Sequence, residues 1–584
     1  MRDDVKKYKE FSRRTFLIGA VQGALIAALA SRFYYLQITN RNKYSLLSEN
    51  NRIRVRTIAP ARGIVVDRDN VVLIDNAPSY NLVIDSEDLD HAEEIISRVE
   101  KILSRSIFSS AIERARKAAI AQKASLILIQ DIGWKDVVRI ELQLDPIGAE
   151  IRKSFGRSYP FAEILGHLTG YVAKPSLTDE KENGHNFGPD FFIGKNGVEK
   201  VFESDIRGIP EVRKLEVTAT GRVERTISIQ ESTPGKNLVL SVSSSVQSIV
   251  REQMKEVAAG TAVVMNPDNG EVLALYSWPS YDPNEFVNGV SSVYWKKLLG
   301  DPGKPLINKA ILGNYPPGSI FKLVVALAAL KYGIDPQQKV LCTGEYRVGS
   351  RICHCWKKGG HGYVDLLDAI AMSCNVYFYI NGSRIGIDNI AGMARMLGLG
   401  EKSGIQLPYE NAGLMPDAAW KRRKTGKPWR IGDTINASIG QGYVLVTPIQ
   451  LANMASRLIS GREIRPGLLT NNKDNAFPRI SGVEDADRAL VLEGMKGVFS
   501  NPSGSGHLYN PVASGLEIAG KTSTAQVISQ RSDVSASNRE HGVFLGFAPY
   551  SSPKYVVSII VEHGGWGSKS ALPIGVGILK ALLL

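Results

Sequence analysis

A segment without charged side chains lies close to the N-terminus, at residues 15–31, and an aromatic cluster follows it at 33–36. Its 17 residues are at the short end of a membrane-spanning helix, and Arg32 and the aromatic side chains extend it at the interface. Six basic residues within 1–14 place the N-terminus in the cytoplasm and the rest of the chain outside. The pattern therefore predicts a basic tail at 1–14 and a transmembrane anchor at 15–36.

Two other interpretations of this terminus stay open. Ala28-Leu29-Ala30 matches a signal-peptide cleavage site, and Arg13-Arg14 with the residues around it resembles a twin-arginine export signal. The body of the chain is predicted to be exported in each case, whether the N-terminus is a cleaved signal, a twin-arginine signal or an uncleaved anchor.

The next part of the chain, residues 37–235, alternates short β-type and helical patterns. Strands are predicted at 63–67, 71–74, 80–84 and 214–217, and helices at 93–103 and 111–122. From about residue 174 the composition becomes polar and glycine-rich, and no catalytic constellation occurs anywhere in 37–235. These residues are therefore predicted to form a pedestal that spaces, docks or dimerises the protein.

The remainder, residues 236–584, begins after the turn at Thr233-Pro234-Gly235. In chain order, the pattern predicts strand 237–241, helix 245–258, strands 260–265 and 271–275, strands 542–547 and 555–561, and helix 575–584. Asp268-Asn269-Gly270 supplies the turn of the first hairpin. Helical runs between hairpins indicate an α+β domain in which helices flank an antiparallel sheet.

Length and charge limit the class of protein. A chain of 584 residues is too long for one core, so two or three domains are expected. A formal charge of +13 would suit nucleic acid, but the sequence has no basic–aromatic stripe and no recognised nucleic-acid module. The charge instead suits a basic face beside anionic lipid or cell-wall polymer.

Candidate chemistry begins at Ser319-Ile-Phe-Lys322. The turn at Tyr315-Pro-Pro-Gly318 precedes an apolar helical run at 321–330, which places Ser319 at a helix N-terminus with its own N–H free. Lys322 lies at i+3 on the same face, within reach of the serine oxygen. A capping serine and a surface lysine would give the same pattern, so this segment alone does not decide between nucleophile and cap.

Two later motifs favour the nucleophile. A serine needs a base, and a lysine is a base only when burial or a neighbouring cation keeps it neutral. Lys521, on a predicted strand that continues through Thr522, Ser523 and Thr524, could supply that cation, and the strand edge could pair with a peptide. Ser373-Cys374-Asn375, at the start of an apolar helix, adds a hydroxyl and an amide, although a plain helix cap has the same sequence.

The four cysteines of the chain all lie within 33 residues, beside His354 and His361. In an exported protein disulfides are one explanation, and a tetrahedral thiolate–imidazole zinc site is the other. The residues proposed for the metal are Cys342, Cys355, His361 and Cys374. Cys353 and His354 are left over and could displace one of these ligands.

Ser-x-x-Lys, Ser-x-Asn and a Lys-Thr motif in this order resemble the signature of penicillin-binding proteins and serine β-lactamases. The flanking segments are more specific and resemble class B penicillin-binding proteins, in particular the cell-elongation enzymes: YPPGSIFK, SCNVYFY, INASIGQGYVLVTPIQLA, GKTSTAQV and GVFLGFAP. ARGIVVDRDN and GKNGVEKVFESDIRG resemble the pedestal of that class, so the likeness spans nearly the whole chain. CWKKGGHGYVDL resembles a zinc-binding insertion found there, which favours metal over disulfides.

The resemblance implies a D,D-transpeptidase that needs no cofactor for its chemistry. Ser319 would attack the D-Ala-D-Ala carbonyl of a peptidoglycan stem peptide, and Lys322 would take its proton. Ser373 would relay a proton to the leaving amine, and Asn375 would orient the lysine and the substrate amide. An amine from a neighbouring strand would then form the cross-link, and β-lactams would trap Ser319.

The same resemblance implies the binding roles. Lys521 and Thr522 would hold the substrate carboxylate, and the N–H groups of Ser319 and Thr524 would bind the oxyanion. Ser523 departs from the family, which has glycine at that position. Because serine is small, we expect altered β-lactam affinity rather than loss of activity.

Family likeness also implies a single-pass protein of the Gram-negative inner membrane with a periplasmic catalytic domain. Its implied partners are a membrane glycosyltransferase of the SEDS type and rod-complex proteins. Three alternatives remain: a division-specific transpeptidase, which the Cys/His insertion disfavours; a β-lactam sensor, whose effector is absent; and a weakly catalytic scaffold, which Ser523 keeps open.

Overall fold

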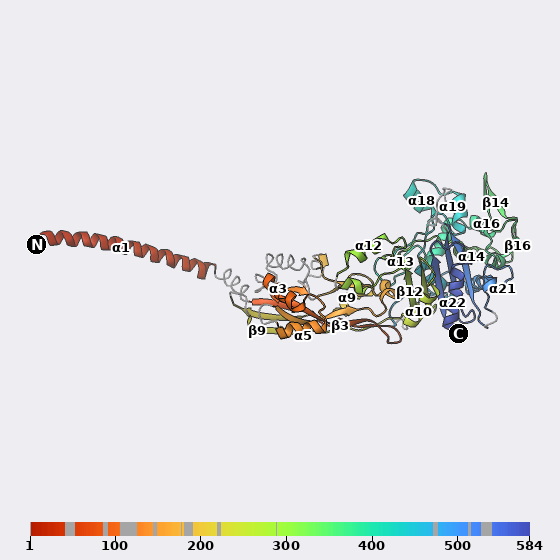
Figure 1. The fold of residues 1–584 in the computed structure, drawn as a ribbon. Coiled ribbons are helices and arrows are strands. Elements are labelled where there is room, and N and C mark those ends of the chain that lie inside the picture. Colours follow the sequence, from red (N-terminus) through yellow and green to blue (C-terminus); the bar gives the residue numbers. More distant parts are fainter. Residues whose placement is uncertain are drawn as a thin grey trace.

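The computed structural model describes residues 2–40, 53–85, 92–104, 125–143, 149–176, 178–179, 191–218, 223–287, 289–470, 477–511, 515–526 and 540–584. Figure 1 shows an elongated arrangement, with helix α1 (Arg2–Tyr34) at one end and the C-terminal domain at the other. The strands of the N-terminal half lie between them. The helix predicted at 111–122 lies outside the described residues.

The N-terminal helix has the dimensions of a membrane anchor. α1 continues into a short π-helical turn at Tyr35–Thr39, and the stretch Arg13–Thr39 is long and apolar enough to cross a bilayer. Its large apolar side chains contact nothing else in the described structure: Phe16 and Ile26 are 78% and 66% exposed. Exposed apolar surface on this scale is stable in a lipid environment and unfavourable in water.

The pedestal contains two main sheets. One has the order β1 (Ile53–Ile58), β8 (Glu211–Val217) and β9 (Val223–Gln230). The other has the order β10 (Leu238–Val239), β2 (Val65–Val66), β3 (Val72–Asp85) and β4 (Ser125–Ile129), with β5 (Ala149–Ser158) also paired to β3. Helices α3 (Ala92–Leu103) and α5 (Trp134–Gln143) pack in a core with Leu82 and Ile84.

The two strands predicted at 71–74 and 80–84 form one continuous strand, β3, although Asn76-Ala77-Pro78 between them is a sequence typical of a strand end. The strand continues because β5 pairs with it without interruption from Asp75 to Ile84. Strand β4 pairs with the other side of β3 only from Leu82 onward. Pro78 lies before that point, so its missing N–H removes no hydrogen bond from the β3–β4 ladder.

A buried group of charges holds the pedestal together. Glu199 is fully buried and accepts hydrogen bonds from Arg62 Nη2 at 2.7 Å and Arg157 Nε at 2.5 Å. Arg62 also pairs with Glu203 at 2.7 Å. The two guanidinium groups hold the pKa of Glu199 below its usual range, although burial alone would raise it.

The C-terminal domain is built on one five-stranded antiparallel sheet. Its order is β12 (Val272–Trp278), β11 (Gly260–Met265), β19 (Tyr555–Val561), β18 (His541–Ala548) and β17 (Ala519–Ala525). Side chains alternate between two cores: Ala262 and Val264 face one cluster, and Val263 and Met265 face the other. Both faces are therefore covered, which explains why β11 is buried along its whole length.

Helices cover the two faces of this sheet as the α+β prediction requires. α10 (Ser244–Gln253) and α22 (Ala571–Leu583) pack on one face, and α20 (Pro448–Ser460) and the apolar helix α14 (Lys322–Lys331) belong to the other layer. α10 ends five residues before the predicted end at 258, because the chain turns there to enter β11. β17 is an edge strand, so one side of its backbone is open.

Candidate active site

Ser319 lies in a one-turn 3₁₀ helix, Gly318–Phe321, that leads directly into α14. Gly318 starts this turn with φ +53°, and its N–H donates to the carbonyl of Gly440 at 3.0 Å. A Cβ at Gly318 would lie 2.2 Å from Ser523 Oγ, so the turn requires glycine on both grounds. The predicted helix after Ser319 is confirmed.

The expectation that the Ser319 N–H is free is wrong. This N–H donates a hydrogen bond to Ser523 Oγ at 2.7 Å. The two residues are 204 positions apart, so the contact arises only when strand β17 lies against the turn.

Lys322 is fully buried and bonded to the second motif. Its Nζ donates to Asn375 Oδ1 at 2.6 Å, and to the carbonyl and hydroxyl of Ser373 at 2.9 and 3.2 Å. Burial lowers the pKa of Lys322 from 10.5 to about 8. Within the described residues no hydrogen bond joins Lys322 to Ser319, so the base and the nucleophile share a site without direct contact in this state.

Ser373 lies between α15 (Leu366–Ala371) and α16 (Asn375–Ile385), with φ +58°. This left-handed conformation is unfavourable for a residue with a Cβ, and such strain is common at functional sites. Cys374 caps α16, and its N–H donates to the carbonyl of Ala369 at 3.0 Å. The turn places the side chains of Ser373 and Asn375 where both accept hydrogen bonds from Lys322.

The third motif lies on β17. Lys521 is fully buried, and burial together with the charge of Lys322 lowers its pKa well below the usual value. The expected direction of this coupling is not observed: the charge of Lys322 lowers the pKa of Lys521, whereas the pKa of Lys322 is lowered by its own burial, without a contribution from Lys521. Thr522 Oγ1 shares a hydrogen bond with Ser505 Oγ at 3.0 Å.

The three motifs meet at one cavity of about 310 Å³. Its lining includes Ser319, Ser373, Asn375, Thr522, Ser523 and Thr524, so six of the predicted site residues lie on one surface. Lys322 and Lys521 lie behind that surface and are fully buried. Sequence reasoning missed the remaining lining residues: Trp356, Ile439, Gln441, Ser505, Gln526, Glu540, Trp566 and Ser568. None of these carries a chemical motif of its own, although Trp356, Ile439, Gln441 and Gln526 fall within segments that resemble the family.

The Cys/His cluster forms a closed set of ligands. Cys342, Cys355, His361 and Cys374 place their ligand atoms within 4.8 Å of one another. All four cysteines of the chain are unpaired, so the disulfide interpretation does not hold in this structure. Cys353 lies on β15 (Arg351–His354) and, like His354, outside the cluster.

The donor set and its spacing fit zinc. Cys342 Sγ and Cys355 Sγ lie 3.6 and 3.5 Å from His361 Nδ1. A tetrahedral zinc ion at normal bond lengths would place sulfur and nitrogen about 3.6 Å apart. The hydrogen bond between Cys355 and Cys374 lowers the pKa of the Cys355 thiol and raises that of the Cys374 thiol, so the two sulfurs share one proton that a bound metal ion would displace.

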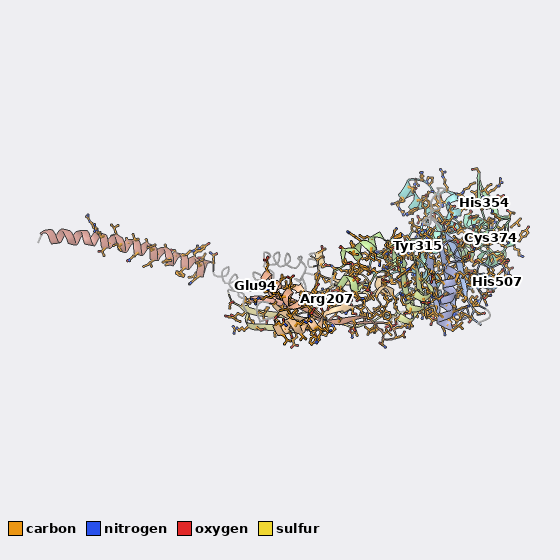
Figure 2. The ribbon with its side chains drawn as sticks, viewed as in Figure 1. Glu94, Arg207, Tyr315, His354, Cys374 and His507 are labelled. Atoms are coloured by element: carbon orange, nitrogen blue, oxygen red, sulfur yellow. The ribbon has the colours of Figure 1, made fainter. Side chains whose placement is uncertain are left out.

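Figure 2 locates these parts on the molecule. Tyr315, His354, Cys374 and His507 lie in the C-terminal domain, whereas Glu94 and Arg207 mark the pedestal. The catalytic motifs and the cluster therefore lie at the end of the molecule that is far from α1.

Comparison with known proteins decides the family. Residues 260–581 match the penicillin-binding protein transpeptidase domain, and residues 57–240 match the penicillin-binding protein dimerisation domain. This chain belongs to the penicillin-binding protein family. The predicted class and the α+β fold with a pedestal and one apolar N-terminal helix are thereby confirmed.

Individual relatives cover nearly the whole of this penicillin-binding protein. Peptidoglycan D,D-transpeptidase MrdA of Acinetobacter baumannii is 33% identical, with 98% of this chain and 88% of the relative aligned. The Helicobacter pylori complex between PBP2 and MreC contains a chain that is 28% identical, with a TM-score of 0.80 and coverage of 91% and 98%. A peptidoglycan synthase complex contains another, 27% identical, with a TM-score of 0.71 and coverage of 97% and 98%.

Proposed function

We propose that this protein is a serine peptidoglycan D,D-transpeptidase that cross-links stem peptides during elongation of the lateral wall. One observation carries the proposal: a hydroxyl, a buried lysine, a second hydroxyl and an open strand edge converge on a single cavity. The relatives named peptidoglycan D,D-transpeptidase support it over nearly the full chain. We assign residues 37–235 to the pedestal and 236–584 to the catalytic domain.

Acylation uses the groups around Lys322. Ser319 Oγ attacks the carbonyl carbon of the penultimate D-Ala as neutral Lys322 takes the hydroxyl proton. The Oγ–C bond forms, the C–N bond to the terminal D-Ala breaks, and Ser373 passes a proton to the departing amine. Asn375 and the backbone of Ser373 hold the Lys322 ammonium during this transfer. An acceptor amine then attacks the ester and releases Ser319.

Substrate recognition uses the open edge of β17. Thr522, which lines the cavity, binds the terminal carboxylate, and Lys521, buried behind it, supplies a positive charge; the charge of the carboxylate in turn favours the protonated form of Lys521. Thr524 accepts a hydrogen bond from Gln441 Nε2 at 3.5 Å through its carbonyl, which therefore points to the open edge. Because the N–H and C=O of one strand residue point to the same side, the Thr524 N–H faces the cavity beside the Ser319 N–H. These two amides form the oxyanion hole.

We further propose that Cys342, Cys355, His361 and Cys374 hold a structural zinc ion. Four protein ligands leave no open position, so the ion contributes rigidity and no chemistry. Cys374 adjoins Ser373 and caps α16, so the metal would hold the left-handed turn that directs Ser373 and Asn375 to Lys322. Cys355, which follows the hairpin of β14 (Glu345–Val348) and β15, and His361 would connect that hairpin to this turn through the metal.

The remaining assignments concern location and partners. The apolar helix α1 supports a single-pass inner-membrane protein with a cytoplasmic N-terminus and a periplasmic catalytic domain. The similarity to a PBP2 solved with MreC and to a member of a peptidoglycan synthase complex supports rod-complex proteins and a SEDS-type glycosyltransferase as partners. The basic charge of the chain suits a membrane surface.

Mapping a penicillin adduct tests the proposed function. Intact mass after incubation with benzylpenicillin should increase by one penicillin per chain, because the strained amide acylates one serine. Peptide mapping should place the adduct on Ser319. An adduct on another residue, or none after prolonged incubation, would refute the acyl-enzyme mechanism.

The acylation rate should depend on pH through Lys322. Its pKa is lowered from 10.5 to about 8, and only the neutral amine accepts the Ser319 proton. The second-order rate constant with benzylpenicillin should therefore increase from about pH 6.5 to about 9 and level off above that, as the neutral fraction saturates. Stopped-flow acylation across this range measures it, and a rate that falls with increasing pH would exclude Lys322 as the base.

A further inference from the structure

Ser523 makes a contact that the usual glycine cannot make. Its side chain is only 4% exposed, and its hydroxyl accepts a 2.7 Å hydrogen bond from the Ser319 N–H. That N–H is one of the two donors of the proposed oxyanion hole. In the free protein this donor is therefore already bonded to the protein's own side chain.

The backbone on both sides of this contact is held in place by packing and hydrogen bonds. Gly318, which precedes Ser319, is bonded to Gly440 at 3.0 Å and packs closely against it: a Cβ at Gly440 would lie 2.2 Å from the Gly318 carbonyl oxygen. On the other side β17 is fixed by its ladder, in which Ser523 pairs with Val543. The hydroxyl can leave the amide by rotation about the Cα–Cβ bond of Ser523, without movement of either backbone segment.

The position of the hydroxyl conflicts with that of a reacting carbonyl. An oxyanion has to lie about 3 Å from both the Ser319 and the Thr524 N–H. Ser523 directly precedes Thr524 on β17, and its hydroxyl oxygen occupies the hydrogen-bonding direction of the Ser319 amide. A carbonyl oxygen can enter only after the hydroxyl has left this amide.

We propose that the Ser523 hydroxyl caps the oxyanion hole, so that it must rotate away before Ser319 is acylated. Ser523 thereby lowers the rate at which carbonyl substrates and β-lactams react with Ser319, and it acts outside the proton-transfer machinery. This inference rests on the proposed function of Ser319. It differs from a steric role, because the hydroxyl and not the Cβ carries the effect.

Two substitutions separate the hydroxyl from the Cβ. Ser523→Ala keeps the Cβ and removes the acceptor, and Ser523→Gly removes both. A neutral hydrogen bond of ordinary net strength corresponds to about fivefold in rate. We therefore expect both variants to be acylated by benzylpenicillin about fivefold faster than wild type. The increase should appear in the acylation step and not in the prior dissociation constant, since the contact opposes only carbonyl entry.

A boronic acid that carries the benzylpenicillin side chain gives an independent readout. Its tetrahedral adduct places an oxygen in the oxyanion hole, so its affinity should increase by a similar factor in both variants. Ser558→Ala serves as the matched control, because Ser558 is a buried serine in the same sheet whose hydroxyl has no partner within the described structure. Acylation of this control should equal that of wild type.

The outcomes are distinct. Faster acylation in Ser523→Gly alone would show that the Cβ acts, and unchanged or slower acylation in both variants would show that the hydroxyl does not cap the amide; either result overturns the inference. A wild-type protein that benzylpenicillin fails to label at Ser319 would instead overturn the proposed function.

Discussion

Replacing Ser319 with alanine should abolish acylation by benzylpenicillin and the formation of cross-linked peptidoglycan, with a decrease of at least about 1,000-fold. No second hydroxyl replaces it, because Ser373 is bonded to Lys322 and lies in a turn with its own geometry. Stopped-flow acylation and product analysis with lipid-linked stem peptides measure the loss. The melting temperature should change little, because the substitution removes one hydroxyl from the surface of the cavity.

The Ser319→Ala protein also separates an enzyme from a scaffold. A scaffold that only positions a glycosyltransferase would keep its function without the nucleophile. We expect cells that carry only this variant to lose their rod shape, although the protein is folded and membrane-anchored. Normal rods with no acylating activity would contradict the enzymatic function and favour the scaffold.

The second large effect is expected from removal of the proposed zinc ion. Metal binding contributes its free energy to folding, roughly 10 kcal/mol or more for structural zinc sites in small peptides. Even a part of this energy would lower the melting temperature by about 10 °C in a domain of this size. We expect zinc at one ion per chain by elemental analysis, and we expect chelation or Cys355→Ser to lower both the melting temperature and the acylation rate. The rate should fall because the proposed ion, through Cys374 at the start of α16, would hold the turn that carries Ser373.

The chain offers its own control for this experiment. Cys353 is a buried cysteine two residues from Cys355, but it lies outside the ligand cluster. Cys353→Ser should retain one zinc ion per chain and the acylation rate of wild type. Equal zinc loss in both variants would show that the ligand set is wrong, and a fully active protein without zinc would show that the site does not support catalysis.

The zinc prediction illustrates where local sequence was sufficient and where it was not. The clustering of four cysteines in 584 residues indicated a site, but spacing left metal and disulfide open. The structure brings Cys342 and Cys374, from different elements, to His361 and forms no disulfide among the four cysteines, which supports the proposed metal site. The evidence for a ligand cluster is therefore the distance between the side chains in space, which their spacing in the sequence does not determine.

The sequence by itself determined the local elements and the inventory of reactive groups. The apolar run after Ser319 defined a helix, the turn at Asp268-Asn269-Gly270 defined a hairpin, and the order of the three motifs indicated the family. These features depend on side-chain periodicity, turn chemistry and recurring segments, all of which act over a few neighbouring residues.

Only the tertiary structure decided the state of those groups. The pKa of Lys322 is lowered because α14 is enclosed on all sides, and the Ser319 N–H is occupied because β17 approaches from 204 residues away. Likewise β3 remains one strand across Pro78 because β5 pairs with it. Burial and long-range contacts depend on how distant segments pack, and the same local pattern is compatible with several packings.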